Sequence, residues 1–443
     1  MAAEVFYNYV SNYITNYLVN KLISDTLCSK PKNTMKNRLL VLLLLTVLIN
    51  SVFAQSPHLL QLGERKEIES QVLGETRQYY VQLPQGYDRD RPARYPVAYL
   101  LDGEVLLPAL HTVHQFYSGG FIPEMVLIGI DNSQNRNRDL TTSSVEMLYG
   151  QPARNTTGKA DKFLEFLRTE LIPHIENNYP VTGYRTLIGH SYGGLFTLYA
   201  LLQTPELFAN YLAIDPSLDW DNQHLYKVAK ESERLKRLQN KSLFISLNGQ
   251  LHMQDPSVTI DNVMEDQSFF TQFARANMTF TNLLREEAAE GLDLHWKFYP
   301  NDLHGTIPLP SIMDGLIAMF AWFQMENTHK FNDFETPVAT LEGIIKNRAQ
   351  KLEAHFGYAV PPYPEDLVNA MSYMSMDMGK PQKARMFLDH YLQYFPQQAA
   401  AYEAMADYYE RQQESSKALE FAQKALDISG SEHHRKQVER LKN

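Results

Sequence analysis

Short apolar runs alternate with longer stretches of helical periodicity through the first three quarters of the chain. The pattern predicts strands at 78–83, 95–101, 125–130, 186–188, 211–214, 242–247 and 294–299. A helix is expected over 162–178, where apolar residues recur on one face. Such alternation predicts an α/β sheet with helices on both faces. The run 78–83 alternates polar and apolar residues, as in an antiparallel edge, whereas 125–130 is continuously apolar, as in a buried parallel strand.

The sequence changes character after Phe323. A proline-rich stretch, 361–364, follows a further expected helix at 341–356, and the pattern is wholly helical from there. Residue types recur at an offset of 34, as in Ala370/Ala404, Lys383/Lys417 and Phe387/Phe421. This period is typical of tetratricopeptide repeats, so we expect two such repeats over 365–432 and a tail over 433–443. They are interpreted either as a groove for a protein partner or as a packing or self-associating appendage.

The start of the chain resembles an export signal. Residues 35–54 combine a basic start, an apolar stretch at 39–49 and small residues before Gln55, which is the order of a secretory signal peptide. An uncleaved anchor is the alternative, although the apolar stretch is short for a membrane span. Met35 is then the expected initiator, and 1–34 an upstream segment wrongly included. We therefore expect a periplasmic or extracellular bacterial protein.

Composition narrows the possible functions. The single cysteine, Cys28, precedes the expected cleavage point, so the mature chain has no thiol for catalysis or for metal binding. With 44% hydrophobic residues the chain is globular, and its net charge of −10 leaves no basic face for nucleic acid. A small, neutral or polar substrate fits this charge better.

The motif Gly189-His190-Ser191-Tyr192-Gly193 stands between a strand-like run and an apolar helical run. A sharp turn between strand and helix holds a serine at the edge of the sheet in a strained conformation, and the glycines leave room for the neighbouring chain. This context predicts that Ser191 is a nucleophile.

A serine hydroxyl needs a base, and histidine has a suitable pKa. His304 follows the last predicted strand by a short loop and precedes a helix expected at 312–323, which is the position of the base in α/β hydrolases. His190, inside the turn, is interpreted as a packing or supporting residue.

The acid that would orient His304 is less clear from the sequence. It is expected soon after the strand 242–247, where Asp255 is the first carboxylate, and we predict Asp255. Asp261, Asp215 directly after the preceding strand, and a Ser–His pair without an acid remain open alternatives.

An oxyanion formed at Ser191 needs two donors. The backbone N–H of Tyr192 is the first, because it follows the nucleophile. The second is expected in the loop after the strand 95–101, where Gly103 would let the chain approach the site and the N–H of Glu104 would donate. No group of residues has metal-ligand spacing, so no metal or cofactor is expected.

These segments together resemble a known family. The resemblance is to the putative esterase family that includes esterase D and the enterochelin and feruloyl esterases, and it rests on the stretches 101–103, 125–131, 138–141, 189–194, 215–218 and 304–305. The resemblance covers about 55–325, so the esterase domain is expected over 55–330 and a linker over 331–364. It implies an α/β-hydrolase fold, serine esterase activity on a small-molecule ester, and no metal. Asp219 stands where an aromatic residue is usual, which makes the substrate harder to infer.

The sequence therefore predicts an exported serine esterase that acts through an acyl-enzyme on a small or siderophore-like ester. An acyltransferase or peptidase on the same fold is one alternative. A catalytically idle scaffold that presents the helical repeats is another.

Overall fold

The computed structural model describes residues 62–442, apart from 85–86, 88–93, 149–150, 154–155, 289 and 334. The expected signal peptide, the segment before it and Cys28 lie outside these residues. No helix within the described ranges combines the length and the apolar character that crossing a membrane requires.

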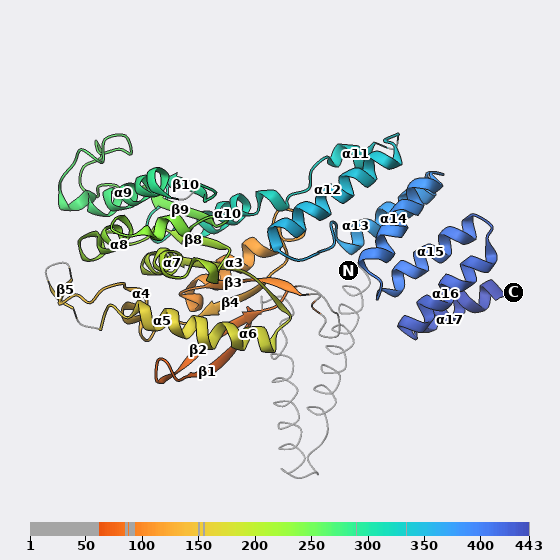
Figure 1. The fold of residues 1–443 in the computed structure, drawn as a ribbon, viewed down its shortest axis with the longest axis horizontal. Coiled ribbons are helices and arrows are strands. Elements are labelled where there is room, and N and C mark those ends of the chain that lie inside the picture. Colours follow the sequence, from red (N-terminus) through yellow and green to blue (C-terminus); the bar gives the residue numbers. More distant parts are fainter. Residues whose placement is uncertain are drawn as a thin grey trace, which may run out of the picture. The chain divides into compact units, whose positions relative to one another are not determined.

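An eight-stranded mixed sheet organises the described residues up to 299 (Figure 1). The strand order is β1-β2-β4-β3-β7-β8-β9-β10, in which β1, β2 and β4 pair antiparallel and the other neighbours pair parallel. The bounds are β1 Glu64–Ser70, β2 Glu75–Gln82, β3 Tyr95–Leu100, β4 Val126–Ile130, β7 Val181–His190, β8 Asn210–Ile214, β9 Ser242–Asn248 and β10 Asp293–Tyr299. A separate small hairpin joins β5 Met147–Leu148 and β6 Gln151–Pro152.

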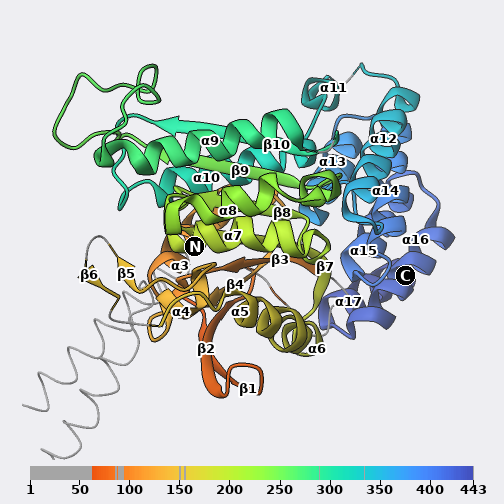
Figure 2. The same cartoon turned by 60° about the vertical axis from the view of Figure 1, so that its left-hand side comes forward.

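Helices lie on both sides of this sheet (Figure 2). They are α3 Gly103–Tyr117, α4 Arg136–Leu140, α5 Ala160–Phe166, α6 Ile172–Asn178, α7 Tyr192–Gln203, α8 Trp220–Lys230, α9 Gln272–Glu287 and α10 Pro308–Met319. A π-helical turn at Leu167–Leu171 joins α5 to α6, so the helix expected over 162–178 is present with one widened turn.

Successive residues of β3 show how the sheet divides the core. Val97 and Tyr99 pack with residues of α5 to α9 in one apolar cluster, whereas Ala98 and Leu100 pack with α3 and α10 in a second cluster. Side chains of a strand alternate between its two faces, and both faces here are covered. The central strands are buried throughout, as expected for parallel strands between helical layers.

Each of the seven predicted strands is present, and the α/β architecture is confirmed. The run at 78–83 forms part of β2, which is antiparallel as expected but is not the edge strand. The edge is β1, whose sequence Glu-Arg-Lys-Glu-Ile-Glu-Ser has one apolar residue, Ile68, and so gives little strand signal.

A wholly helical end follows the sheet domain. It comprises α11 Thr328–Asn332, α12 Val338–Phe356, α13 Glu365–Asp377, α14 Pro381–Tyr394, α15 Ala399–Arg411, α16 Ser415–Ser429 and α17 Glu432–Lys442. The helices α13/α14 and α15/α16 pack as hairpins, and the bounds of α13 recur 34 residues later in α15. The hydroxyl of Tyr373 donates to Asp407, its neighbour at the same offset. The assignment of these hairpins to the tetratricopeptide class stays a prediction.

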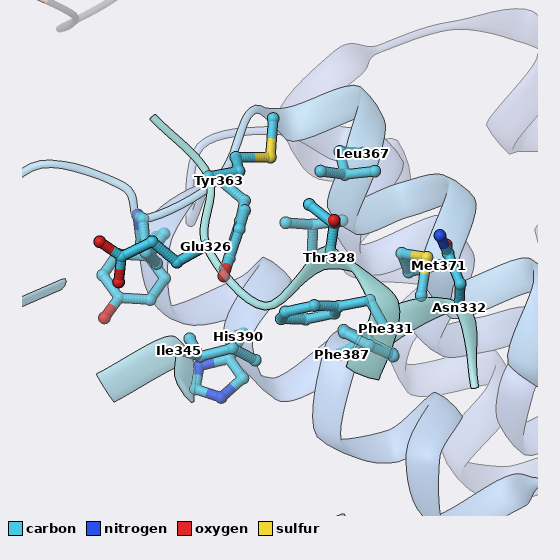
Figure 3. A pocket seen from close by; sticks show the side chains of 14 residues that line it. Glu326, Thr328, Phe331, Asn332, Ile345, Tyr363, Leu367, Met371, Phe387 and His390 are labelled. Carbon is cyan, nitrogen blue, oxygen red and sulfur yellow. The ribbon is translucent and has the colours of Figure 1, made fainter. Parts of the chain in front are cut away.

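A cavity of about 300 Å³ lies among α11 to α14 (Figure 3). Its lining is mostly apolar and includes Phe331, Ile345, Leu367 and Phe387. The rings of Phe331 and Tyr363 lie 5.3 Å apart, edge to face. The helical end therefore has its own apolar centre, with an unfilled space at the side of α12.

Helix α12 belongs to both apolar centres. Leu341 and Ile345 pack with the helical end, whereas Leu352 and Phe356 pack in the cluster that holds α10. The guanidinium of Arg348, midway between them, donates to the carbonyl oxygens of Phe323, Gln324 and Pro362. Residues from Leu62 onward accordingly form one compact unit, and a helix beyond the boundary expected at 330 completes the core of the sheet domain.

We predict that Phe356→Ala destabilises the whole described unit. Phe356 is 8% exposed and its ring lies 5.0 Å from the rings of both Tyr184 and Trp322. Removal of a buried phenyl group typically costs about 3–5 kcal/mol in the free energy of unfolding. Urea unfolding of both variants is the measurement, with Glu353→Ala, an exposed change on the same helical turn, as the control. Equal midpoints for the two variants would show that α12 is not part of the core.

A second prediction concerns acid stability. Nε2 of the buried His114 accepts the N–H of Met125 at 2.8 Å, and burial, with a smaller effect from His111, lowers the pKa of His114 to about 4. Between pH 6.5 and 4 the unfolded chain therefore binds a proton that the folded chain does not. The free energy of unfolding should fall over this range as the pH falls, by about 3 kcal/mol from this group.

The measurement is chemical unfolding at a series of pH values for the unchanged protein and for His114→Gln, whose amide oxygen can still accept the N–H. All other ionisable groups are the same in both proteins, so the difference in slope isolates His114. Identical pH dependence would contradict the prediction.

Candidate active site

The turn between β7 and α7 holds Ser191 in a strained conformation, with φ 60° and ψ −115°. A Cβ atom at Gly189 would lie 2.2 Å from the carbonyl oxygen of Gly193, and one at Gly194 would lie 3.0 Å from that of Ile214. A side chain at Gly189 would collide with the backbone, and one at Gly194, the residue after the motif, would be crowded by it, whereas a Cβ atom at Gly193 would lie no closer than 3.4 Å to its neighbours. The strained serine between close-packed glycines has the geometry expected of a nucleophile elbow.

His304 lies opposite this serine. Its Nε2 is 3.1 Å from Oγ of Ser191, within hydrogen-bond distance. The loop that carries it is fixed to the loop after β9, because His304 N–H donates to Oε1 of Gln250 at 2.8 Å and Gly249 N–H donates to the carbonyl of Asp302 at 2.9 Å. The imidazole is 40% exposed, so it is held on one side and open to solvent on the other.

Asp215 occupies the third position. Its Oδ2 lies 2.5 Å from Nδ1 of His304, and its side chain is fully buried. Oδ1 accepts the backbone N–H of Asn248 at 3.0 Å, and the side-chain amide of Asn248 donates to Oδ2. A carboxylate in this place fixes the His304 tautomer with the proton on Nδ1, which leaves Nε2 free to accept a proton from Ser191.

The prediction that Asp255 contacts His304 is wrong. Asp255 is exposed, and its carboxylate accepts the N–H and the hydroxyl of Ser257, which lower its pKa. Asp261 is exposed on the same loop. The sequence predicts the acid after β9, but Asn248, the last residue of that strand, donates instead to the carboxylate of Asp215, which directly follows the neighbouring strand β8.

His190 is a neutral neighbour of this group. Its ring centroid lies 4.6 Å from that of His304, and burial, followed by the nearby His304, lowers its pKa to about 4. It therefore adds no positive charge beside His304 near neutral pH. The ring of Phe273 also lies edge-on to the ring of His304, with 5.5 Å between their centroids. These contacts agree with the interpretation of His190 as a supporting residue.

The proposed oxyanion donors are both in the first turns of helices. Tyr192 begins α7 and Glu104 is the second residue of α3. The two turns are adjacent, since a Cβ atom at Gly193 would lie 3.6 Å from Oδ2 of Asp102. Arg136 joins them, as it pairs with both oxygens of Asp102 at 2.9 Å and lies 5.2 Å from the ring centroid of Tyr192.

The second donor stays a prediction. Gly103 approaches β4 as closely as glycine allows, because a Cβ atom there would lie 2.4 Å from Gly129. The carboxylate of Glu104 accepts the N–H of Asn132 at 3.2 Å, and burial is the main cause that raises the pKa of Glu104. The close approach made by Gly103 is therefore to β4, and not the approach to the site for which this glycine was expected.

A comparison with protein families identifies the chain. The model of the family described as "Putative esterase" matches residues 70–302, which include Ser191 and Asp215 and end just before His304. The chain belongs to the putative esterase family. Its members are hydrolases, and the resemblance drawn from the sequence motifs is confirmed.

Curated relatives of this esterase act on siderophores, according to their names. It is 30% identical over 207 residues to the ferri-bacillibactin esterase BesA of Bacillus subtilis, a match that covers 43% of this chain and 72% of the relative. It is 30% identical over 184 residues to the siderophore enterobactin esterase of Emericella nidulans, with 38% of this chain and 59% of the relative covered.

Solved structures agree on the fold. An IroE-like serine hydrolase from Shewanella oneidensis superposes with a TM-score of 0.60 at 28% identity, over 75% of this esterase and 99% of that chain. An uncharacterised protein from Capnocytophaga ochracea superposes with a TM-score of 0.54 over 86% of this esterase and 99% of that chain, and at 18% identity it shows the fold alone. The α/β-hydrolase fold and the serine hydrolase class are therefore established for this chain.

The geometry predicts which acid matters for turnover. Asp215→Asn should lower kcat by orders of magnitude, roughly 10⁴ in the best-studied triad, because His304 loses the partner that fixes its tautomer. Asp255→Asn and Asp261→Asn serve as matched exposed controls and should leave kcat nearly unchanged. Hydrolysis of a short nitrophenyl ester at equal folded concentration is the measurement. A large loss at Asp255, or a mild effect at Asp215, would reject this assignment.

Proposed function

We propose that the protein hydrolyses a siderophore-like carboxylic ester through an acyl-enzyme formed on Ser191. The observation that carries the proposal is the continuous line of contacts from Oγ of Ser191 to Nε2 of His304 and from Nδ1 of His304 to Asp215. No other role explains as simply why a strained serine faces an imidazole that is backed by a buried carboxylate.

In the first half of the reaction, Oγ of Ser191 attacks the ester carbonyl carbon while its proton passes to Nε2 of His304. The carbonyl oxygen becomes an oxyanion, for which the N–H groups of Tyr192 and Glu104 are the proposed donors. The C–O bond to the alcohol then breaks, and the alcohol leaves with the proton from Nε2. The acyl group remains on Ser191.

Water completes the cycle in the second half. His304 takes one proton from the water as its oxygen attacks the acyl carbon, and it returns the proton to Oγ of Ser191 as the acid departs. The carboxylate of Asp215 stabilises the imidazolium in both halves without taking its proton.

The substrate class is inferred from the relatives. The names of three curated relatives specify esters of ferri-bacillibactin, enterobactin and triacetylfusarinine C. These matches support an ester of a siderophore as the substrate here. Transfer of the acyl group to an alcohol or amine would use the same acyl-enzyme and is distinguished by the product.

Export is also part of the proposal. The order of basic, apolar and small residues over 35–54 supports cleavage before Gln55 and a periplasmic or extracellular location. N-terminal sequencing of the protein from fractionated bacterial cells would test this, since a retained residue 35 or a cytoplasmic location would contradict it. A protein partner or self-association through the helical end remains a further proposal.

The decisive test uses a serine-directed phosphonate. It should label the purified protein once, at Ser191, and Ser191→Ala should lose both the label and the hydrolysis of a siderophore triester. Ser217→Ala is the matched control, because its hydroxyl lies 3.2 Å from that of Ser191 but makes no contact with His304 among those the structure describes. Full activity of the Ser191→Ala variant would reject the mechanism, whereas an unchanged protein that neither takes the label nor hydrolyses esters would favour an idle scaffold.

A further inference from the structure

The last helix of the chain is joined to α15 by a regular series of polar contacts. His433 contacts Glu403, Gln437 donates to Asp407, and Arg440 donates to Glu410, and each pair is 30 residues apart. Two of these pairs are of common types: the Gln437 amide faces the Asp407 carboxylate, and the Arg440 guanidinium faces the Glu410 carboxylate. The pair at Glu403 differs from them.

Two imidazoles face the single carboxylate of Glu403. Nε2 of His433 lies 2.6 Å from Oε1, and Nε2 of His434 lies 3.2 Å from Oε2. One donor atom from each of the three residues can be chosen so that all three lie within 4.8 Å of one another. Both oxygens of Asp407 and of Glu410 also accept hydrogen bonds, from Gln437 and Tyr373 and from two N–H groups of Arg440. The Glu403 site differs in the chemistry of its partners, because both are imidazoles, which can bind a metal ion in their neutral form.

The buried imidazole is also fixed from behind. His434 is 8% exposed, and its Nδ1 lies 2.6 Å from Oγ of Ser429 and 2.8 Å from Oγ of Ser431. Histidines that bind metals usually have the second ring nitrogen hydrogen-bonded in this manner, which fixes the ring and directs the other nitrogen to the ion. His433 is open to solvent, with 70% of its side chain exposed, and gives an ion access to the site.

We propose that Glu403, His433 and His434 form a binding site for a divalent transition-metal ion of the zinc type. Two neutral imidazole nitrogens and one carboxylate oxygen are ligands that suit Zn²⁺, whereas Mg²⁺ and Ca²⁺ prefer oxygen alone. Because the ligands come from α15 and α17, the ion would fasten the last helix of the chain to the helical end. Sequence spacing gave no sign of this site because the ligands are brought together only by helix packing.

The site is independent of the proposed hydrolase chemistry. The second group of this kind among the described residues is His190, Asp215 and His304, in which His304 already contacts both Ser191 and Asp215. A metal titration must therefore separate the two groups.

The experiment is calorimetric titration of the purified protein, prepared without a polyhistidine tag, with Zn²⁺ and with Mg²⁺. We expect one Zn²⁺ per chain at the helical end and no binding of Mg²⁺ there. The titration is repeated with His304→Ala to remove binding at the triad, and this variant should keep the Zn²⁺ site. Melting temperature should rise with Zn²⁺ concentration, since an ion that binds the folded state stabilises it.

Ligand variants then test the assignment. His433→Ala and Glu403→Gln should each weaken Zn²⁺ binding at least tenfold, and His433 is exposed enough that its loss should not prevent folding. Arg440→Ala is the matched control, because it breaks another contact of the same series without removing a ligand, so it should lower stability but keep the response to Zn²⁺. Absence of Zn²⁺ binding, or equal binding by His433→Ala and the unchanged protein, would overturn the proposal.

Discussion

The buried carboxylate of Asp215 is the group on which the arrangement of the site depends. Three donors converge on it: Nδ1 of His304 and the backbone and side-chain N–H groups of Asn248. A buried carboxylate is costly unless such donors compensate for the lost water. The loop that carries His304 is therefore fixed where Asp215 is satisfied, and Ser191 lies in front of it.

The parallel register of the sheet makes this convergence possible. His190 pairs with Ile214, and Ile214 pairs with Ser246, so the ends of β7 and β8 are level and β9 extends two residues further, to Asn248. Ser191 and Asp215, which follow β7 and β8, and Asn248, the last residue of β9, are then neighbours at one edge, which is where α/β sheets place their sites. Loss of one strand register would separate Ser191, Asp215 and Asn248 together.

The sequence predicts what is local and misses what depends on pairing between strands. The elbow at Ser191 and the loop position of His304 can both be found from short patterns. The acid cannot, because the sequence does not show that Asn248 of β9 donates to Asp215, the residue that follows β8. The edge strand β1 is not predicted, for a local reason: Ile68 is its one apolar residue. Arg348 is a different case, because nothing in the sequence indicates that its guanidinium is buried among carbonyl oxygens.

The helical end bears on the site through a continuous apolar layer. Helix α10 begins four residues after His304, and its Ile312 and Leu316 share one cluster with Leu352 and Phe356 of α12. Arg348 of α12 binds the carbonyl of Phe323, which precedes α12 in the sequence, and the carbonyl of Pro362, which follows it. If the helical end regulated the site allosterically, the helices between them would need two discrete arrangements. The contacts described here define one packed arrangement. We infer that the helical end supports the position of His304 because the two parts share one packed core. Substitutions in α12 should therefore lower the amount of folded enzyme before they lower the kcat of the folded enzyme.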